Sequence, residues 1–194
     1  YFDRVIATDP SQEQIKNAIA APKVEYRVAS AEESGLPDHS VDLLTAATAA
    51  HWFEHAKFYP EARRVLKTNG IIALWTYSMA HISPAIDELM NWWAYDYLLP
   101  YWPDGRWYVR QQYTTLPFPF EAMETPAFHC TMHWTRDQWL NYLRSWSAYN
   151  KFIGQHSTDP IEEALIGKLS ALWPEQEVKE ITWPLHLKCA RVSQ

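Results

Sequence analysis

The sequence predicts an α/β fold with a mostly parallel sheet, and two short apolar runs are the main reason. Val41 to Ala46 and Ile71 to Trp75 have the length and composition of parallel strands that are covered on both faces. Between them, apolar residues recur at helical spacing: Phe58, Ala62, Val65 and Leu66. Asn69 and Gly70 follow as a helix stop. Strand, helix and strand in this order form one βαβ unit, around which we expect the other elements to be arranged.

The residues before this unit continue the same alternation. Tyr1 to Thr8 reads as a strand, and Val24 to Ala29 reads as the next one. A helix is expected between them, beginning near Pro10 and Ser11. Its apolar side chains share one face: Ile15, Ala18 and Ile19. This alternation is typical of an open parallel sheet with right-handed crossover connections.

The composition argues against several classes of protein. The chain has 194 residues, with 17 Lys and Arg against 23 Asp and Glu and a formal net charge of −6, so nucleic acid is disfavoured as a partner. No apolar run approaches the length of a membrane-spanning helix. Cys130 and Cys189 lie far apart and lack metal-ligand spacing, which favours a reduced, cytoplasmic protein without a metal site.

The second half of the chain differs from the first in its aromatic content, since most of the 11 Trp and 11 Tyr residues follow position 75. Helical length is predicted for Ile86 to Leu99, and another helix is predicted from Thr135 onward. The apolar face of the latter consists of Trp139, Leu140, Leu143 and Trp146. Because aromatic side chains at helical spacing usually pack in a core, we expect most of these rings to form the core of a cap and some to line a pocket.

The last residues are predicted to form a helix and a strand pair. The helix covers Ile161 to Leu172. The strands, Glu177 to Trp183 and Leu185 to Val192, are expected to form an antiparallel hairpin, with Pro184 marking a bend or an edge.

Three predicted strand ends carry candidate binding residues, because ligands of open α/β sheets bind beyond the carboxyl ends of the strands. They are Asp9, Ser30 to Glu32, and Ala47 to Trp52. A carboxylate at such a position can accept hydrogen bonds from both hydroxyls of a ribose, whereas the alternative role of Asp9 is to cap the next helix. Ala31 could pair with an adenine edge through its backbone or could be an ordinary loop residue. The alternative for His51 and Trp52 is packing at a helix start.

Three stretches, in this order, resemble the class I S-adenosylmethionine-dependent methyltransferases. They are VIATDPSQEQI, VEYRVASAEESGLPDHSVDLLTAATAAHWF and FYPEARRVLKTNGIIALWTYS. Within that family the chain is similar to the small-molecule methyltransferase type 11 group, which includes the trans-aconitate methyltransferase-like proteins. The later segments YLRSWSAY and ITWPLHLKCARV resemble the same group, so the similarity covers most of the chain, although residues 78–130 match it only loosely.

The resemblance implies a Rossmann-like, mostly parallel sheet with a C-terminal antiparallel hairpin and an aromatic-rich helical cap. It implies S-adenosyl-L-methionine as the cofactor and S-adenosyl-L-homocysteine as the product. The implied cofactor-binding residues are Asp9, Ser30, Ala31, Glu32, Thr48, His51 and Trp52. Asp9 would hold the ribose hydroxyls, the backbone amide of Ala31 would meet the adenine, and residues 48–52 would line the methionine half and the substrate entrance.

The sequence departs from the family in two places. Ser30 stands where the family often has an aspartate that contacts the adenine amino group, so this contact is expected to be altered or lost. The family's first strand, its GxGxG loop and the helix after it have no counterpart here, because none of the five glycines forms such a loop. The chain is therefore expected to be N-terminally truncated relative to the family. Because that strand lies in the middle of the family's sheet, two strand edges would lack partners.

The resemblance divides the chain into three parts. Residues 1–77 form the core of the Rossmann-like domain, residues 78–160 form the aromatic cap that selects the substrate, and residues 161–194 complete the sheet. The substrate-contacting candidates are Tyr77, Trp107, Arg110, Tyr113, Trp146 and Tyr149. Arg106, Arg110 and Arg144 could clamp an anionic acceptor, the alternative being ordinary surface charge. No catalytic residue and no metal ligand is assigned.

The function expected from these observations is S-adenosylmethionine-dependent methyl transfer to a small molecule, by O-methylation of a carboxylate. An ionised carboxylate needs no general base, and the transfer depends chiefly on proximity and on excluding water. The alternative is a non-catalytic methyltransferase-like module that has lost its cofactor site and assembles as a homo-oligomer through exposed sheet edges. A dinucleotide oxidoreductase shares the acidic strand end, but the series EARRVLKTNG before an apolar strand disfavours it. Neither a membrane nor nucleic acid is expected as a partner.

Overall fold

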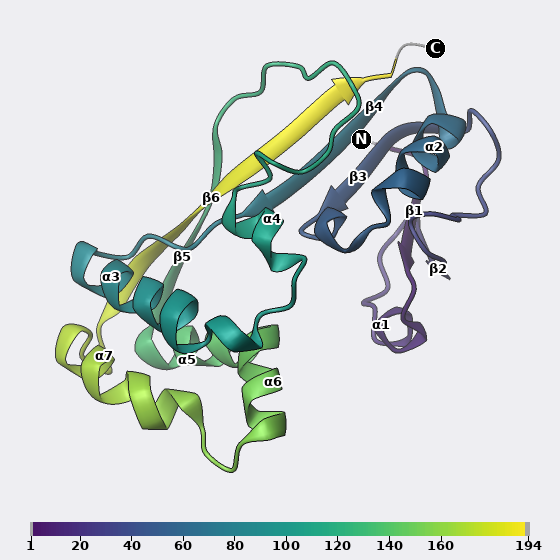
Figure 1. The fold of residues 1–194 in the computed structure, drawn as a ribbon. Helices are drawn as coiled ribbons and strands as arrows, with labels where there is room; N and C mark the ends of the chain where they lie inside the picture. The colour runs from purple at the N-terminus through teal and green to yellow at the C-terminus, as the bar shows by residue number, and fades with distance from the viewer. Residues whose placement is uncertain (1, 193–194) are drawn as a thin grey trace. The chain divides into compact units, whose positions relative to one another are not determined.

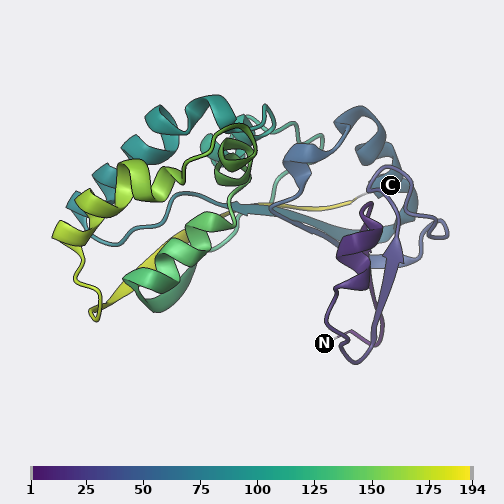
Figure 2. The same ribbon diagram turned by 90° about the horizontal axis from the view of Figure 1, so that it is seen from below.

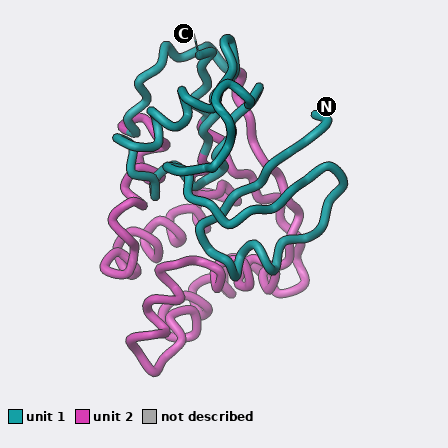
Figure 3. The backbone as a smooth tube through the Cα atoms, turned by 90° about the vertical axis from the view of Figure 1, so that its right-hand side faces the viewer, with its two compact units in different colours: residues 1–75, 116–125, 187–194 teal, residues 76–115, 126–186 magenta. Residues whose placement is uncertain are grey.

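A computed structural model describes residues 2–192, and its mixed arrangement of helices and strands confirms the predicted α/β class (Figure 1). The chain forms two compact units. Unit 1 contains residues 1–75, 116–125 and 187–194, and unit 2 contains residues 76–115 and 126–186 (Figure 3). The segment 116–125 therefore belongs to unit 1, although it lies within the part of the sequence expected to form the cap.

The first strands form a small parallel sheet in unit 1. β1 (Val5–Asp9) pairs with β2 (Val24–Val28), so both predicted strands are present. α1 (Gln12–Lys16) lies against the pair (Figure 2). The predicted helix is wrong in its length, because it ends at Lys16 and leaves Ile19 86% exposed instead of on a buried face. Tyr1 lies outside the described residues.

A second sheet contains four strands in the order β3-β4-β6-β5. β3 (Val41–Ala47) runs parallel to β4 (Leu66–Tyr77), as the central βαβ unit predicts. β6 (Val178–Arg191) runs antiparallel to β5 (Phe128–Thr135). Among the described residues the two sheets are separate, and the interruption falls between β1 and β3.

The predicted antiparallel pair is present, but its strands are not the predicted ones. Residues 177–183 and 185–192 were expected to form a hairpin, whereas the single strand β6 runs through both, from Val178 to Arg191. Pro184 lies inside that strand opposite His129, and its carbonyl accepts a hydrogen bond from the Ser78 amide at 3.3 Å. Proline lacks only the donor of a strand residue, so an extended backbone continues through it while the carbonyl remains in use.

The helix of the βαβ unit is α2 (His55–Val65), and its buried face is as predicted. Phe58, Ala62 and Val65 are almost completely buried, and Tyr59 joins them. The predicted helix stop at Asn69 and Gly70 is wrong, because the helix ends at Val65 and β4 begins at once with Leu66. Residues between Leu66 and Ile71 loop out as an irregularity in the strand, with Asn69 at a positive φ of 65°.

The close packing around Gly70 leads to the first prediction. A Cβ added there would lie 2.9 Å from the Lys67 carbonyl oxygen and 3.2 Å from that of Val41, both of which are backbone atoms. We therefore expect Gly70→Ala to lower the free energy of unfolding by about 1–3 kcal/mol, because an overpacked backbone must shift.

The matched control is Gly154→Ala in α6 (Ser147–Gln155), where an added Cβ meets no atom within 4 Å. Alanine at this helical position should raise the free energy of unfolding by about 0.5–1 kcal/mol. Urea unfolding of both variants is the measurement. Equal effects of the two substitutions would contradict the role assigned to Gly70.

Unit 2 is mainly helical. α3 (Pro84–Trp92) continues into the π-helical turn η2 (Trp93–Tyr97). These two elements together confirm most of the helix predicted from Ile86 to Leu99. A 3₁₀ turn, η3 (Leu99–Tyr101), and α4 (Arg106–Arg110) follow.

Three further helical segments complete unit 2: α5 (Arg136–Arg144), α6, and η4 (Ile161–Leu165) continuing into α7 (Ile166–Leu172). α5 begins after Thr135, as the sequence predicts, and Thr135 and Gln138 form a reciprocal capping box there. The predicted rings of α5 lie in the hydrophobic core of unit 2, together with Trp93, Trp173 and Trp183. None of the helices in residues 2–192 has the length and apolarity that crossing a membrane requires.

Candidate functional site

The three strand ends that the sequence marks as candidates are connected by hydrogen bonds within unit 1, one between backbone groups and one from a backbone amide to a side chain. At the carboxyl ends of β1 and β2, the Ala29 amide donates to the Asp9 carbonyl at 3.2 Å. The loop after β2 is joined to the loop after β3 by the Glu54 amide, which donates to the Glu32 carboxylate at 2.8 Å. Asp9, residues 30–32 and residues 48–52 therefore belong to one connected set of loops.

Asp9 has one carboxylate oxygen engaged and one available. Its Oδ1 accepts a hydrogen bond from the Ser11 amide at 2.7 Å, and no further polar partner of the side chain occurs among residues 2–192. Ser11, and not Asp9, is the N-cap of α1, since its side chain accepts from the Gln14 amide. The half-buried Asp9 carboxylate thus retains an acceptor oxygen at the strand end.

The loop after β2 presents Ser30, Ala31 and Glu32 in different ways. The Ser30 hydroxyl accepts a hydrogen bond from the Glu33 amide at 3.1 Å, which closes a local turn. Ala31 is half-buried and brings no polar side chain. Glu32 accepts from the amide of Glu54, the residue that precedes α2 and whose own side chain makes no cap hydrogen bond. Glu32 therefore satisfies a free amide at the start of α2.

The loop after β3 carries backbone strain. Thr48 has a φ of +49°, which is uncommon for a β-branched residue, and its amide donates to the Trp75 carbonyl at 2.7 Å. The 3₁₀ turn η1 (Ala50–Trp52) follows. His51 is 7% exposed and its ring lies 4.8 Å from that of Trp52, which is 58% exposed. This loop therefore buries the imidazole and presents the indole to solvent.

Glu61 on α2 joins the loop after β2 to the helix, a role that the sequence analysis missed. Its carboxylate accepts hydrogen bonds from the amide and hydroxyl of Ser34, at 2.9 and 2.5 Å, and from the Arg64 guanidinium at 2.8 Å. The Arg64 hydrogen bonds, followed by those of Ser34, lower the pKa of Glu61 from 4.5 to about 2, and burial opposes them only in part. The ionised carboxylate therefore holds this loop in place.

This shift predicts a pH-dependent contribution to stability. A carboxyl group whose pKa is lower in the folded state stabilises the fold above its unfolded pKa, and the contribution disappears as the pH falls from about 4.5 through about 2. We expect Glu61→Gln to lower the free energy of unfolding at pH 7 by about 1–3 kcal/mol, and the difference from wild type to vanish near pH 2.

The control for Glu61→Gln is Glu54→Gln, which breaks an exposed ion pair with Lys57 at the start of the same helix. That pair should contribute less than about 1 kcal/mol. Urea unfolding between pH 2 and pH 7 measures both variants. A Glu61→Gln effect that persists at pH 2 would show that packing, and not charge, is responsible.

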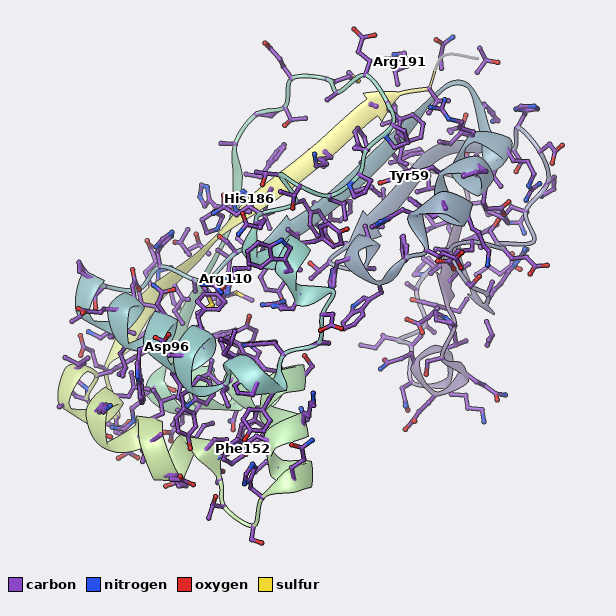
Figure 4. The ribbon with its side chains drawn as sticks, in the orientation of Figure 1. Tyr59, Asp96, Arg110, Phe152, His186 and Arg191 are labelled. Carbon is purple, nitrogen blue, oxygen red and sulfur yellow. The ribbon has the colours of Figure 1, made fainter. Side chains whose placement is uncertain are left out.

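The six substrate candidates all belong to unit 2, where they occupy different environments. Tyr113 and Tyr149 are buried, and the Tyr149 hydroxyl donates to the Asp159 carboxylate at 3.0 Å. Trp107 is 55% exposed. The guanidinium carbon of Arg110, a residue labelled in Figure 4, lies 4.5 Å from the ring centre of Tyr95. Tyr77 and Trp146 both lie near Tyr142.

Tyr142 is a polar centre in the aromatic core that the sequence analysis did not single out. The ring centre of Tyr142 lies 6.0 Å from that of Trp146 and 5.6 Å from that of Trp183, both in edge-on contact. Burial is the main cause that raises the pKa of Tyr142, followed by the proximity of Tyr77. A sequence signal existed, since Tyr142 lies three residues after Trp139 on the predicted helix.

The residues of unit 1 fit part of an adenosine-containing cofactor. Asp9 offers a carboxylate oxygen for a ribose hydroxyl, and the backbone around Ala31 lies in a loop connected to it through β2. Ser30, whose hydroxyl is engaged with Glu33, offers no carboxylate to an adenine amino group. The donor set thus suits the ribose side and the adenine ring better than the adenine amino group.

Comparison with known proteins agrees with this arrangement. The family model described as "Methyltransferase domain" matches residues 1–74. A protein of Dictyostelium discoideum that is named as a methyltransferase is 32% identical over 193 residues, covering 96% of this chain and 73% of its own length. A protein of Saccharomyces cerevisiae, named as an S-adenosylmethionine-dependent methyltransferase, is 22% identical over 208 residues, covering 89% of this chain and 72% of its own.

Solved structures give the same result. A protein of Anaeromyxobacter dehalogenans, described as a type II methyltransferase, superimposes with a TM-score of 0.89 and 36% identity, covering 99% of this chain and 82% of its own. A protein of Bacillus halodurans described as a methyltransferase has a TM-score of 0.50 at 21% identity, which supports the fold alone. From its sequence relatives and its Rossmann-like fold, this chain belongs to the class I S-adenosylmethionine-dependent methyltransferases.

Proposed function

We propose that the protein transfers a methyl group from S-adenosyl-L-methionine to a small molecule and releases S-adenosyl-L-homocysteine. The observation that carries this proposal is the connected set of loops at the carboxyl ends of β1, β2 and β3, with the Asp9 carboxylate at the end of the first strand. The yeast relative named as S-adenosylmethionine-dependent supports the same cofactor. When bound, the cofactor supplies the methyl group as an electrophile.

The proposed roles in unit 1 divide between holding the cofactor and shaping its surroundings. Asp9 accepts hydrogen bonds from the ribose, and the backbone of Ala31 meets the adenine ring. Glu32 and Ser30 hold the loop after β2 in shape, since both are engaged with backbone amides. Thr48, His51 and Trp52 form the wall after β3, where the exposed indole of Trp52 offers an apolar surface that excludes water.

The proposed acceptor group is a carboxylate. An ionised carboxylate is already a nucleophile, so the chain needs to bind, orient and desolvate it and needs no general base. The residues proposed to contact the acceptor come from unit 2 and include Tyr77, which lies near Tyr142. A tyrosine hydroxyl can donate a hydrogen bond to a carboxylate oxygen. We place this activity in the cytoplasm, on the ground that Cys130 and Cys189 are both free thiols.

The test is calorimetric titration of the full-length protein with S-adenosyl-L-homocysteine. Saturable binding with one site per chain is the expected result. Absence of binding by a folded full-length protein would overturn the proposal.

A second candidate function is a non-catalytic assembly module, favoured by the interrupted sheet. Among residues 2–192, β1 pairs only with β2 and β3 pairs only with β4. Unpaired strand edges can pair with strands of another chain. If this alternative holds, the protein forms a homo-oligomer and does not bind S-adenosyl-L-methionine. Sedimentation of a monomer that also binds S-adenosyl-L-homocysteine would exclude it.

A further inference from the structure

Two arginines on α4 lack the polar partners that every other arginine has among the described residues. The sequence contains nine arginines, and seven donate a hydrogen bond or form an ion pair: Arg4, Arg27, Arg63, Arg64, Arg136, Arg144 and Arg191. Arg106 and Arg110 contact only aromatic rings within residues 2–192. The chain has more acidic than basic residues, so two guanidinium groups without a carboxylate partner are unusual in it.

The rings hold both guanidinium groups in defined places. The guanidinium carbon of Arg106 lies 4.6 Å from the ring centre of Trp102, and that of Arg110 lies 4.5 Å from the ring centre of Tyr95. The two arginines are four residues apart on α4, so they share one side of that helix. Figure 4 marks Arg110 on this helix.

The supporting rings are themselves fixed in unit 2. The Trp102 indole donates to the Ala94 carbonyl at 2.7 Å, and its ring lies 5.3 Å from that of Trp146 in the core. Tyr95 is half-buried beside Ala94 in η2. Burial raises the pKa of the Tyr95 hydroxyl, and the positive charges of Arg106 and Arg110 oppose that rise, so both charges act on the same hydroxyl.

A guanidinium that stacks on a ring uses its flat face and leaves its N–H groups directed outward at the edge. Those N–H groups match the two oxygens of a carboxylate, and the contact is stronger when the arginine is held in place beforehand. A tyrosine hydroxyl adds a neutral donor. The chemistry of this cluster suits a carboxylate and not a cation or an apolar group.

We propose that Arg106, Arg110 and the hydroxyl of Tyr95 form a site that binds a carboxylate group of the methyl acceptor. The inference rests on the proposed function in taking the anion to be part of the acceptor. It extends that function by naming the residues that select a charged over a neutral molecule.

Arg63 provides the matched control. Its guanidinium also stacks on a ring, 4.4 Å from the centre of Phe120, but it donates to the Pro119 carbonyl at 2.6 Å. Removing Arg63 therefore removes the same charge and the same kind of ring contact from a guanidinium whose donor edge is already in use. Figure 4 marks the neighbouring Tyr59 on α2.

The experiment measures binding of succinate, with neutral succinamide as the uncharged analogue, to the full-length protein. Tryptophan fluorescence is the readout, because the Arg106 guanidinium contacts the ring of Trp102. The variants are Arg110→Gln, Arg106→Gln/Arg110→Gln and Arg63→Gln, and a separate titration with S-adenosyl-L-homocysteine is made for each. We expect succinate to bind in preference to succinamide, Arg110→Gln to weaken succinate binding on the order of tenfold, and the double variant to weaken it further.

The two titrations separate the outcomes. Arg63→Gln should leave succinate binding unchanged, and all variants should keep wild-type affinity for S-adenosyl-L-homocysteine. The carboxylate site is overturned if the double variant binds succinate as well as wild type does. It is also overturned if Arg63→Gln weakens succinate binding as much as the double variant does. In both cases the methyltransferase proposal stands. No succinate binding by wild type in the presence of bound S-adenosyl-L-homocysteine would also overturn it. If the wild-type protein does not bind S-adenosyl-L-homocysteine, the proposed function is contradicted instead.

Discussion

Trp173→Ala is expected to lower the free energy of unfolding by about 3–5 kcal/mol, a larger loss than that expected for Gly70→Ala or Glu61→Gln. Trp173 ends α7 and is completely buried in the core of unit 2. Its indole N–H donates to the Glu177 carbonyl at 2.8 Å, and its own carbonyl accepts from Arg136 at 3.3 Å. Alanine would leave a cavity the size of an indole, and the Glu177 carbonyl would lose its donor. Because small domains are stable by only about 5–15 kcal/mol, the loss is a large fraction of the total.

Substitution by phenylalanine separates the cavity from the hydrogen bond. Trp173→Phe and Trp139→Phe remove the same atoms from buried side chains, but the Trp139 N–H has no partner among the described residues. We expect Trp173→Phe to cost more than Trp139→Phe by about 1 kcal/mol, because it leaves the Glu177 carbonyl unsatisfied while the other substitution removes an unsatisfied donor. Urea unfolding followed by circular dichroism measures both. Equal costs would assign the stabilising effect of Trp173 to packing alone.

The elements that the sequence predicts well are those whose signal is local. α2 is predictable because Phe58, Ala62 and Val65 fall on one face and all three are buried. α5 is predictable because Thr135 and Gln138 have the spacing of a capping box and form one. In both cases the determining residues lie within one or two turns of each other.

The elements that the sequence misses depend on distant partners. The residues of β5 are mostly exposed, and apolar and polar side chains do not alternate clearly along it. The strand can therefore be identified only from its pairing with β6, which lies about fifty residues later in the chain. Segment 116–125 lies on α2 through the carbonyls of Pro117 and Pro119, which accept from Tyr59 and Arg63. Backbone carbonyls occur at every residue, and nothing in the sequence marks these two.

The candidate site shows the same division. Asp9 and Thr48 could be placed at strand ends because an apolar strand precedes each of them. The hydrogen bond from the Glu54 amide to Glu32 could not be foreseen, since it joins two loops that meet only in the folded chain. The ring contacts of Arg106 and Arg110 depend in the same way on where η2 and η3 bring their rings.

Asp9→Asn is expected to weaken the binding of S-adenosyl-L-homocysteine about 10- to 100-fold, which corresponds to about 1.5–3 kcal/mol for hydrogen bonds to a charged acceptor. The asparagine side chain keeps an oxygen for the Ser11 amide, the only polar contact that the Asp9 side chain makes among residues 2–192. The turn before α1 should therefore be preserved, and what changes is the charge and one acceptor oxygen. Calorimetric titration of the full-length protein gives the affinity directly.

The control is Asp42→Asn, which removes the same charge from an exposed aspartate on β3 that pairs with Lys67 at 2.8 Å. This variant should bind S-adenosyl-L-homocysteine with wild-type affinity, because a surface charge is screened and makes no contact with the loops at the strand ends. An equal loss in both variants would point to a general effect of net charge. Wild-type affinity in Asp9→Asn would remove Asp9 from the cofactor site and leave only its turn at the start of α1, since a carboxylate that accepts from a ribose hydroxyl cannot be neutralised without cost.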